Sequence, residues 1–182
     1  MSKRVLSVRD MCYVAVFTAV IVVLSQIRIP MPFGVPMTLQ TFVIPLAGVV
    51  LGSKLGSLSV LSYVLLGVVG LPVFSGSFGA FGGFGALLGP TGGFILGFPF
   101  YAYAAGRGIE CGRGRGLIFA LFIGMIFTYL LGFTQFALVT GSDLRTSLFT
   151  VVLPFLPTEV IKLTFVWILG PTMCTRLERI GS

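Results

Sequence analysis

Histidine and asparagine are absent from this 182-residue chain, and only 9% of its residues are charged. Its three cysteines, Cys12, Cys111 and Cys174, are widely spaced and form no CxxC pair. Zinc sites and histidine-based catalysis are therefore not expected. The order GxxxxGK followed by Ser or Thr is also missing, so the chain has no P-loop for ATP, and any ATP-driven action would need a partner.

Apolar residues fill the chain instead, at 56% of the sequence with a mean hydropathy of +1.08. A soluble domain of this size cannot hide that much apolar surface, because its outside must be solvated. Several apolar runs approach or exceed the roughly 18 to 20 residues that cross a bilayer. The chain is therefore predicted to be an all-α polytopic membrane protein that forms a single integral membrane domain over residues 1–182.

Six transmembrane helices are predicted, at about 11–28, 38–53, 55–71, 90–106, 116–139 and 155–175. The first apolar run is too long for the h-region of a signal peptide and is followed by further spans, so it is predicted to be a mature helix. Only GSKLG at 52–56 joins the second and third spans, which predicts a tight helical hairpin.

Positive charge lies mainly on one side of these predicted spans. With six spans, nine of the 12 lysine and arginine residues share a side, namely Lys3, Arg4, Arg9, Lys54, Arg107, Arg113, Arg115, Arg176 and Arg179. The positive-inside rule makes that side, which carries both termini, cytoplasmic. The formal charge of +7 then follows from topology, and nucleic acid is not expected as a partner.

Two connections on the predicted outer side are unusual. Residues 28–38 contain three prolines and are predicted to form an extended, semi-rigid segment. Residues 71–93 carry no charge, which is typical of a loop that covers a cavity or lies at the membrane interface. Within it Phe78, Phe81 and Phe84 recur every third residue, either as packing side chains or as an aromatic cover over an apolar ligand.

Two small-residue motifs each allow two interpretations. Ala15 and Ala19 form an AxxxA pair on the first predicted helix, which serves either internal packing or a partner surface. The sequence GPTGG at 89–93 either begins a helix or turns its backbone amides toward a ligand.

A carboxylate and an ammonium stand inside the last apolar run, in PTEVIK at 157–162. Pro157 suits the first turn of a helix, Glu159 there is favoured by the helix dipole, and Lys162 projects from the same face. An ionisable group within a span costs about 2.5–3.5 kcal/mol by insertion scales, so such residues usually have a function. The pair either neutralises itself, with Lys162 snorkelling to the surface, or forms the polar floor of a pocket.

Three polar residues open the second predicted span on the same outer side. Thr38 suits a helix cap. Gln40 and Thr41 either belong only to that helix start or face the same cavity as Glu159 and Lys162.

Four blocks of this sequence resemble the BioY family, the biotin-specific S components of energy-coupling-factor (ECF) transporters. They are VPMTLQTF at 35–42, GLPVFSGSFGAFGG at 70–83, LLGPTGGFILGF at 87–98 and PFLPTEVIK at 154–162. The blocks keep the order and spacing of the family, and the similarity covers nearly the whole chain.

The resemblance implies a six-helix S-component fold in the cell membrane of a prokaryote, with a biotin cavity near the outer face. Members of the family work with a transmembrane coupling protein and two cytoplasmic ATPase subunits, which use the ATP. This chain is therefore expected to be no enzyme and to bind no cofactor of its own. Ala15 and Ala19 match the AxxxA surface that meets the coupling protein in that family.

For the vitamin site, the resemblance assigns the acid and the lysine of the last helix to Glu159 and Lys162. Glu159 stands where the family usually has aspartate, and an asparagine that the family can use has no counterpart in this chain. The predicted substrate-binding residues are Glu159, Lys162, Gln40, Thr41, Phe74, Ser75, Phe78 and Phe81.

The chemistry of biotin suits these residues in two ways. A carboxylate can accept from the ureido N–H groups while an ammonium donates to the ureido carbonyl, or Lys162 can instead pair with the valerate carboxylate. An S component for a different vitamin is one alternative function. Another is an ion- or proton-coupled carrier in which Glu159 titrates, although only one acid lies within a predicted span. A membrane-embedded enzyme would have few candidate catalytic groups.

Overall fold

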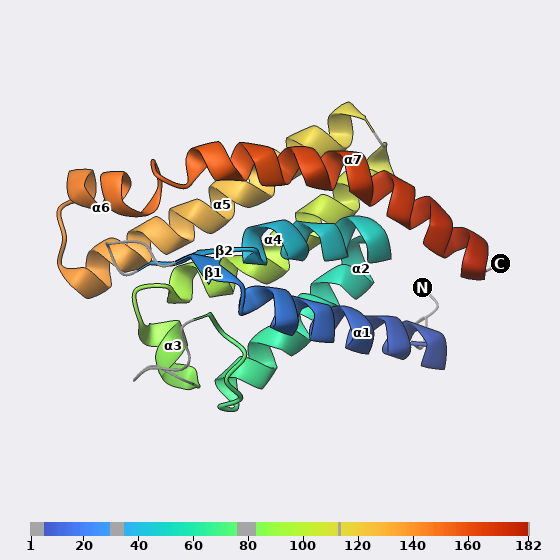
Figure 1. The fold of residues 1–182 in the computed structure, drawn as a ribbon, viewed down its shortest axis with the longest axis horizontal. Helices are drawn as coiled ribbons and strands as arrows, with labels where there is room; N and C mark the ends of the chain where they lie inside the picture. Colours follow the sequence, from blue (N-terminus) through green and yellow to red (C-terminus); the bar gives the residue numbers. More distant parts are fainter. Residues whose placement is uncertain (1–5, 30–34, 76–82, 113, 182) are drawn as a thin grey trace, which may run out of the picture.

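The computed structural model describes residues 6–29, 35–75, 83–112 and 114–181 (Figure 1). Within them the chain is almost entirely helical. The elements in order are α1 (Val8–Ser25), β1 (Arg28–Ile29), β2 (Met37–Thr38), α2 (Gln40–Val68), α3 (Phe84–Leu88), α4 (Gly92–Cys111), α5 (Arg115–Thr140), α6 (Leu144–Val151) and α7 (Leu156–Gly181).

Four helices in the described part of the chain are long and apolar enough to cross a membrane: α1, α2, α5 and the Leu156–Leu177 part of α7. The predicted spans 11–28, 116–139 and 155–175 correspond to α1, α5 and α7. The predicted span 90–106 corresponds to α4, which is helical as expected but is not among the four. The number of spans and their orientation therefore stay predictions.

The chain reverses inside α2, at Gly52. This residue has φ 81° and ψ 171°, a conformation open essentially only to glycine, and it interrupts an otherwise continuous helix. The two halves of α2 then pack so closely that a side chain on Gly56 would collide with the backbone of Gly48. The helical hairpin predicted at 52–56 is thus confirmed.

Glu110 ties the Gly52 turn to the end of α4. Its Oε1 atom accepts hydrogen bonds from the backbone N–H and the hydroxyl of Ser53, both at 2.8 Å. The other oxygen, Oε2, pairs with Arg107 at 2.9 Å. A carboxylate from α4 therefore caps the second half of α2, whose first N–H groups lack partners within the helix.

The centre of the fold consists of α2, α4 and α5, with α4 packed between the other two and with α1 and α7 against α2. The largest fully buried side chains include Tyr63 on α2, Phe98 and Tyr101 on α4, and Leu117 on α5. Close approach depends on small residues, since a side chain on Gly48 would collide with the backbone carbonyl of Ala102.

Three parts of the structure differ from the sequence expectations. Helix α1 begins at Val8, three residues before the predicted start, because Ser7 and Asp10 form a capping box there. The short helices α3 and α6 were not predicted. In α6 the side chains of Ser147 and Val151, four residues apart, are both buried, so one face of the helix covers the interior.

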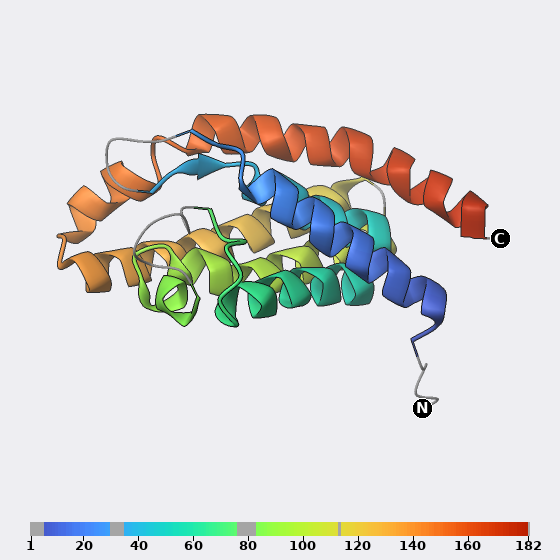
Figure 2. The ribbon, with the colours of Figure 1, turned by 60° about the horizontal axis from the view of Figure 1, so that its bottom comes forward.

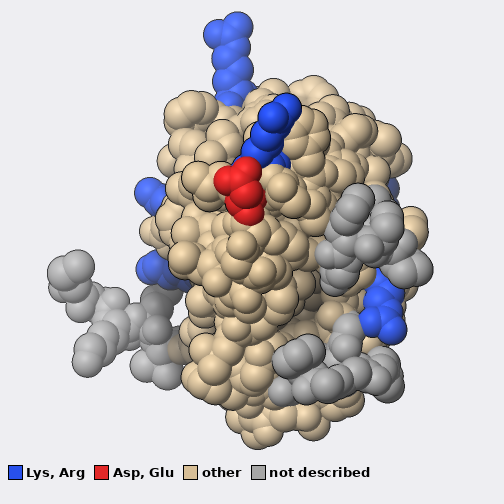
Figure 3. All heavy atoms as spheres, turned by 90° about the vertical axis from the view of Figure 1, so that its left-hand side faces the viewer, with Lys and Arg blue, Asp and Glu red and all other residues tan. Residues whose placement is uncertain are grey.

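The extended segment predicted at 28–38 is extended in its described residues. Strands β1 and β2 pair antiparallel, with Arg28 opposite Thr38 and Ile29 opposite Met37. This small ribbon lies with α3 and α6 at one end of the molecule, while α1 begins and α7 ends at the other (Figures 1 and 2). Seen from the ribbon end, the surface is largely uncharged (Figure 3).

Candidate functional site

A cavity of about 560 Å³, counted with its open mouth, lies at the ribbon end of the molecule. The segment leading into β2, the first turns of α2, α4 and α7, and the middle of α5 all contribute to its wall. The lining residues are Val35, Pro36, Thr38, Gln40, Thr41, Phe74, Ser75, Thr91, Phe94, Ile95, Phe98, Tyr129, Val151, Phe155, Glu159 and Lys162.

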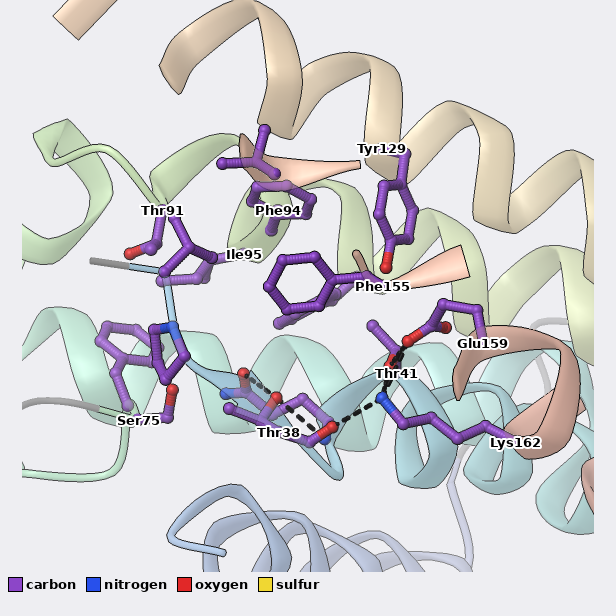
Figure 4. Close-up of a pocket in the computed structure, with 16 residues that line it drawn as sticks. Thr38, Thr41, Ser75, Thr91, Phe94, Ile95, Tyr129, Phe155, Glu159 and Lys162 are labelled. Carbon is purple, nitrogen blue, oxygen red and sulfur yellow. Dashed lines mark hydrogen bonds and ion pairs between the residues drawn. The ribbon is translucent and has the colours of Figure 1, made fainter. Parts of the chain in front are cut away.

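The polar part of this cavity is a network around Lys162 (Figure 4). Its ammonium donates to Oε1 of Glu159 at 2.8 Å, to Oγ1 of Thr41 at 2.9 Å and to the backbone carbonyl of Thr38 at 2.8 Å. The hydroxyl of Thr41 donates to the same Oε1 of Glu159 at 2.6 Å. The three donors of the ammonium are thus all used within the protein, and its side chain is 11% exposed.

Helix α7 places Glu159 and Lys162 on one face because they are three residues apart. The helix begins at Leu156, so Glu159 lies in its first turn, as predicted, and Pro157 stands where a missing N–H costs nothing. The side chain of Glu159 is only 1% exposed. A carboxylate buried this deeply is stabilised by the adjacent ammonium and hydroxyl, because an isolated charge there would be very costly.

One oxygen of Glu159 is left unused. Oε2 is buried and has no hydrogen-bond partner among the residues that the structure describes. A buried acceptor without a partner costs about 1–3 kcal/mol, and more when charged. An N–H donor of a bound ligand would satisfy it.

Gln40 has a different position in the network from Thr41. Its amide nitrogen donates to the hydroxyl of Tyr63 at 2.6 Å, and its amide oxygen accepts from the hydroxyl of Thr38 at 3.1 Å. The backbone N–H of Gln40 also donates to the Thr38 hydroxyl, at 3.3 Å, as expected for a residue at a helix start. Gln40 therefore lines the cavity but is held by the protein, and Tyr63 in turn donates to the carbonyl of Val73 at 3.3 Å.

Aromatic side chains form the apolar wall opposite this network (Figure 4). Phe94 of α4 packs edge to face against Tyr129 of α5, with ring centroids 5.5 Å apart. Phe155 lies below Phe94 in Figure 4, and the hydroxyl of Tyr129 points toward Glu159. Phe74 is buried and packs edge to face on Tyr63 at 5.6 Å. A ligand in the cavity would thus meet polar groups at one end and rings along its length.

Six of the predicted substrate-binding residues line this one cavity: Glu159, Lys162, Gln40, Thr41, Phe74 and Ser75. The other two, Phe78 and Phe81, lie outside the described residues. Phe84 begins α3 and is exposed, and it is not among the lining residues. Ala15 and Ala19 are both exposed on α1, on one face of the helix and away from the cavity.

The comparisons with known proteins place the chain in a family. Residues 1–179 match the BioY family. The chain belongs to this family.

Several proteins named as BioY transporters are similar to the chain over most of its length. A probable biotin transporter BioY from Pyrococcus horikoshii is 39% identical over 154 residues, which cover 85% of this chain and 89% of that protein. The biotin transporter BioY from Rhodobacter capsulatus is 35% identical over 179 residues, covering 91% and 93%. A crystal structure of the S-component for biotin from an ECF-type ABC transporter superposes with a TM-score of 0.82 and 30% identity, over 98% of this chain and 95% of that one.

Ten of the lining residues of this BioY chain were not among the predicted substrate-binding residues, and four of these ten are Thr91, Phe94, Tyr129 and Phe155. Two of them lie within or next to motifs that the sequence made conspicuous, since Thr91 belongs to GPTGG and Phe155 precedes PTEVIK. Tyr129 carried a weaker signal, a hydroxyl in the middle of the long apolar run of α5. Phe94 lies in the block at 87–98 that carries the family resemblance, but its residue type gave no signal of its own, because phenylalanine is common throughout this chain.

Proposed function

We propose that this chain is the biotin-binding S component of an ECF-type transporter, and that the cavity at the ribbon end holds the vitamin. One observation carries the proposal: the paired Glu159 and Lys162 stand at one end of an aromatic cavity in a chain of the BioY family. The names of the similar proteins support biotin as the substrate.

The ureido ring of biotin matches the polar end of the cavity. The ring carries two N–H donors, and the unpartnered Oε2 of Glu159 is an acceptor for one of them. Hydrogen bonds to an ionised group are stronger than those between neutral groups. The thiophane ring and the valeryl chain are apolar and suit the wall of Phe94, Phe155 and Tyr129.

Lys162 has two possible roles in this site. In the first pose it donates to the ureido carbonyl beside Glu159; in the second it pairs with the valerate carboxylate. In either pose the ammonium exchanges a hydrogen bond to Thr38 or Thr41 for one to the ligand, because its three donors are already used.

For the protein in its membrane, we propose six spans in a single integral membrane domain, with both termini on the cytoplasmic side of a prokaryotic cell membrane. The nine basic residues on the predicted inner side support this orientation. The Gly52 reversal supports counting α2 as two spans. In this orientation the cavity opens toward the outside, where a substrate would be captured.

Uptake itself would need partners. We propose that α1 meets a transmembrane coupling protein through Ala15 and Ala19, and that two cytoplasmic ATPase subunits supply the energy. Both alanines are exposed and lie on one face of α1, where a partner helix could approach closely. The chain is then a transport subunit and no enzyme.

Titration calorimetry with the purified chain in detergent tests the proposal. Biotin should bind saturably at one site, without ATP or partner subunits. Competition by other vitamins tests the alternative that the chain is an S component for a different substrate. A vitamin that binds more tightly than biotin would be assigned as the substrate in its place. A sample that is folded by circular dichroism and binds no biotin would overturn it.

The biotin methyl ester separates the two poses of Lys162. If the ammonium pairs with the valerate carboxylate, the neutral ester should bind at least ten times more weakly than biotin. If the ammonium instead meets the ureido carbonyl, the two ligands should bind with similar affinity. Both results are compatible with the proposed function, and each assigns Lys162 one partner.

A further inference from the structure

A second hollow, separate from the biotin cavity, lies between α5 and α7. It measures about 490 Å³ with its open side and is lined by Ile118, Leu121, Phe122, Val160, Leu163, Thr164 and Trp167. None of these residues belongs to the wall of the first cavity. The two helices run alongside one another here (Figure 1).

The lining of this hollow suits a largely apolar occupant. Its polar groups are few: the hydroxyl of Thr164 already donates to the carbonyl of Val160 at 2.8 Å within α7, and the indole N–H of Trp167 is the other donor. Val160 itself is 59% exposed, and Ile118, Phe122 and Trp167 are also exposed. The lining is therefore almost entirely apolar, with the Trp167 N–H as its one donor that has no recorded partner among the described residues.

The hollow continues toward the start of α5. An adjoining, more open hollow shares Ile118 and Phe122 with it and extends over Phe119 and Gly116 to Arg115. Apart from the arginine, this extension is also apolar. Together the two form one groove, which we call the α5–α7 groove, with hydrocarbon side chains along its length and a cation at one end.

Arg115 is available at that end. Its side chain is exposed, and no acidic partner is recorded for it within the described residues: Asp10 forms the capping box of α1 with Ser7, Glu110 pairs with Arg107, Glu159 pairs with Lys162, and Asp143 lies beyond the far end of α5. A guanidinium presents donors that match a phosphate. By the positive-inside rule, Arg115 lies at the cytoplasmic surface, where anionic phospholipid headgroups are found.

We propose that the α5–α7 groove binds an anionic phospholipid, with one acyl chain along Ile118, Phe122 and Trp167 and its phosphate at Arg115. A second copy of the chain would cover the apolar part equally well. Its exposed Asp143, however, lies beyond the far end of α5, away from the end that carries Arg115. The proposal rests on the membrane location and is independent of the identity of the transported vitamin.

Native mass spectrometry of the full chain in detergent tests this with phosphatidylglycerol and phosphatidylcholine of identical acyl chains. We expect one phosphatidylglycerol to bind at least five times more tightly than phosphatidylcholine. Arg115→Gln should abolish that preference, and Arg145→Gln, which removes an exposed arginine from α6, should keep it. Thr164→Trp should fill the groove and weaken binding of both lipids, while circular dichroism shows that each variant is folded.

Equal binding of the two lipids by the unaltered chain would overturn the proposal, as would an unchanged preference in Arg115→Gln. So would a dimer that forms without lipid and is disrupted by Thr164→Trp, because the groove would then be an interface between two copies of the chain.

Discussion

The ammonium of Lys162 lies 2.8 Å from Oε1 of Glu159, one turn away on the same face of α7. The other oxygen of that carboxylate, Oε2, is buried and has no hydrogen-bond partner among the described residues. One oxygen of the carboxylate is therefore hydrogen-bonded, whereas the other has no partner among the described residues. The carboxylate of Glu159, a residue that lines the cavity, therefore keeps one buried acceptor for a donor of a ligand.

Replacing Lys162 by alanine should weaken biotin binding about 10- to 100-fold. A hydrogen bond to a charged group contributes about 1.5–3 kcal/mol, and either proposed pose loses such a bond with the ammonium. Calorimetry on the purified variant measures the change, with circular dichroism as the check on folding.

Thr172→Ala is the matched control for this variant. Thr172 is exposed on the same helix, outside the cavity, and its hydroxyl contacts only the carbonyl of Ile168 in its own helix. Its affinity for biotin should equal that of the unaltered chain. Unchanged affinity in Lys162→Ala would remove the lysine from the site.

Two substitutions at Glu159 separate its charge from its length. Glu159→Asp keeps the carboxylate and shortens the side chain by one methylene. Glu159→Gln keeps the length and removes the charge, which also leaves Lys162 without its ion-pair partner. We expect the aspartate variant to bind biotin within about tenfold of the unaltered chain.

The glutamine variant should lose more affinity and also stability. Removing one partner of a buried ion pair costs about 3–5 kcal/mol of folding free energy, because the remaining charge is uncompensated. Thermal unfolding in detergent should therefore show a lower midpoint for glutamine than for aspartate. If glutamine binds biotin as well as aspartate does, the charge of Glu159 has no part in recognition.

Gly52→Ala should destabilise the fold by about 1–3 kcal/mol, because a non-glycine residue is strained at φ 81°. The new methyl group would also lie 3.2 Å from Oε1 of Glu110, the oxygen that caps the second half of α2. Gly85→Ala in α3 is the control, since its φ is ordinary and a methyl there meets open space. Thermal unfolding compares the two, and equal midpoints would show that the Gly52 turn tolerates a side chain.

Glu110 should make stability depend on pH. It lies beyond the predicted end of the fourth span, at 106. Partial burial acts to raise its pKa, but the hydrogen bonds from Ser53 and the pairing with Arg107 outweigh this and hold the pKa below its ordinary value of 4.5. Since the folded state has the lower pKa, the carboxylate stabilises it fully above the unfolded pKa, and that contribution is lost as the pH falls through the folded value.

Thermal midpoints of the unaltered chain and of Glu110→Gln, measured from pH 7 down to pH 3, test this. The two curves should be separated at pH 7 and converge below about pH 4.5 as the carboxylate of the unaltered chain is protonated. A separation that stays constant over the whole range would mean that the charge of Glu110 does not contribute.

Much of the site was predictable because its polar residues stand out in an apolar chain. Glu159 and Lys162 are the only acid and ammonium inside the last run, and helical spacing alone puts them on one face. Gln40 and Thr41 were conspicuous for the same reason. The aromatic wall was harder to predict, since phenylalanines that line a cavity and phenylalanines that pack elsewhere have the same sequence signal.

Some helix boundaries were also predictable from the local sequence, and others were not. Capping residues are local, and Ser7 with Asp10 could have given the true start of α1. The short helix α6 is harder, because a stretch of eight residues is decided by what it covers, here a face where Ser147 and Val151 are buried.

The sequence by itself determined the class of the protein: too much apolar surface for a soluble domain, a charge bias that orients the predicted spans, a glycine at the hairpin and a lone ion pair in the last helix. These are properties of composition and of neighbours along the chain, so no tertiary contact is needed to see them. Only the tertiary structure decided that Thr41, 118 residues before Glu159, donates to its carboxylate. It also decided that the other oxygen of that carboxylate is buried without a hydrogen-bond partner among the described residues, because this depends on how α2, α5 and α7 pack.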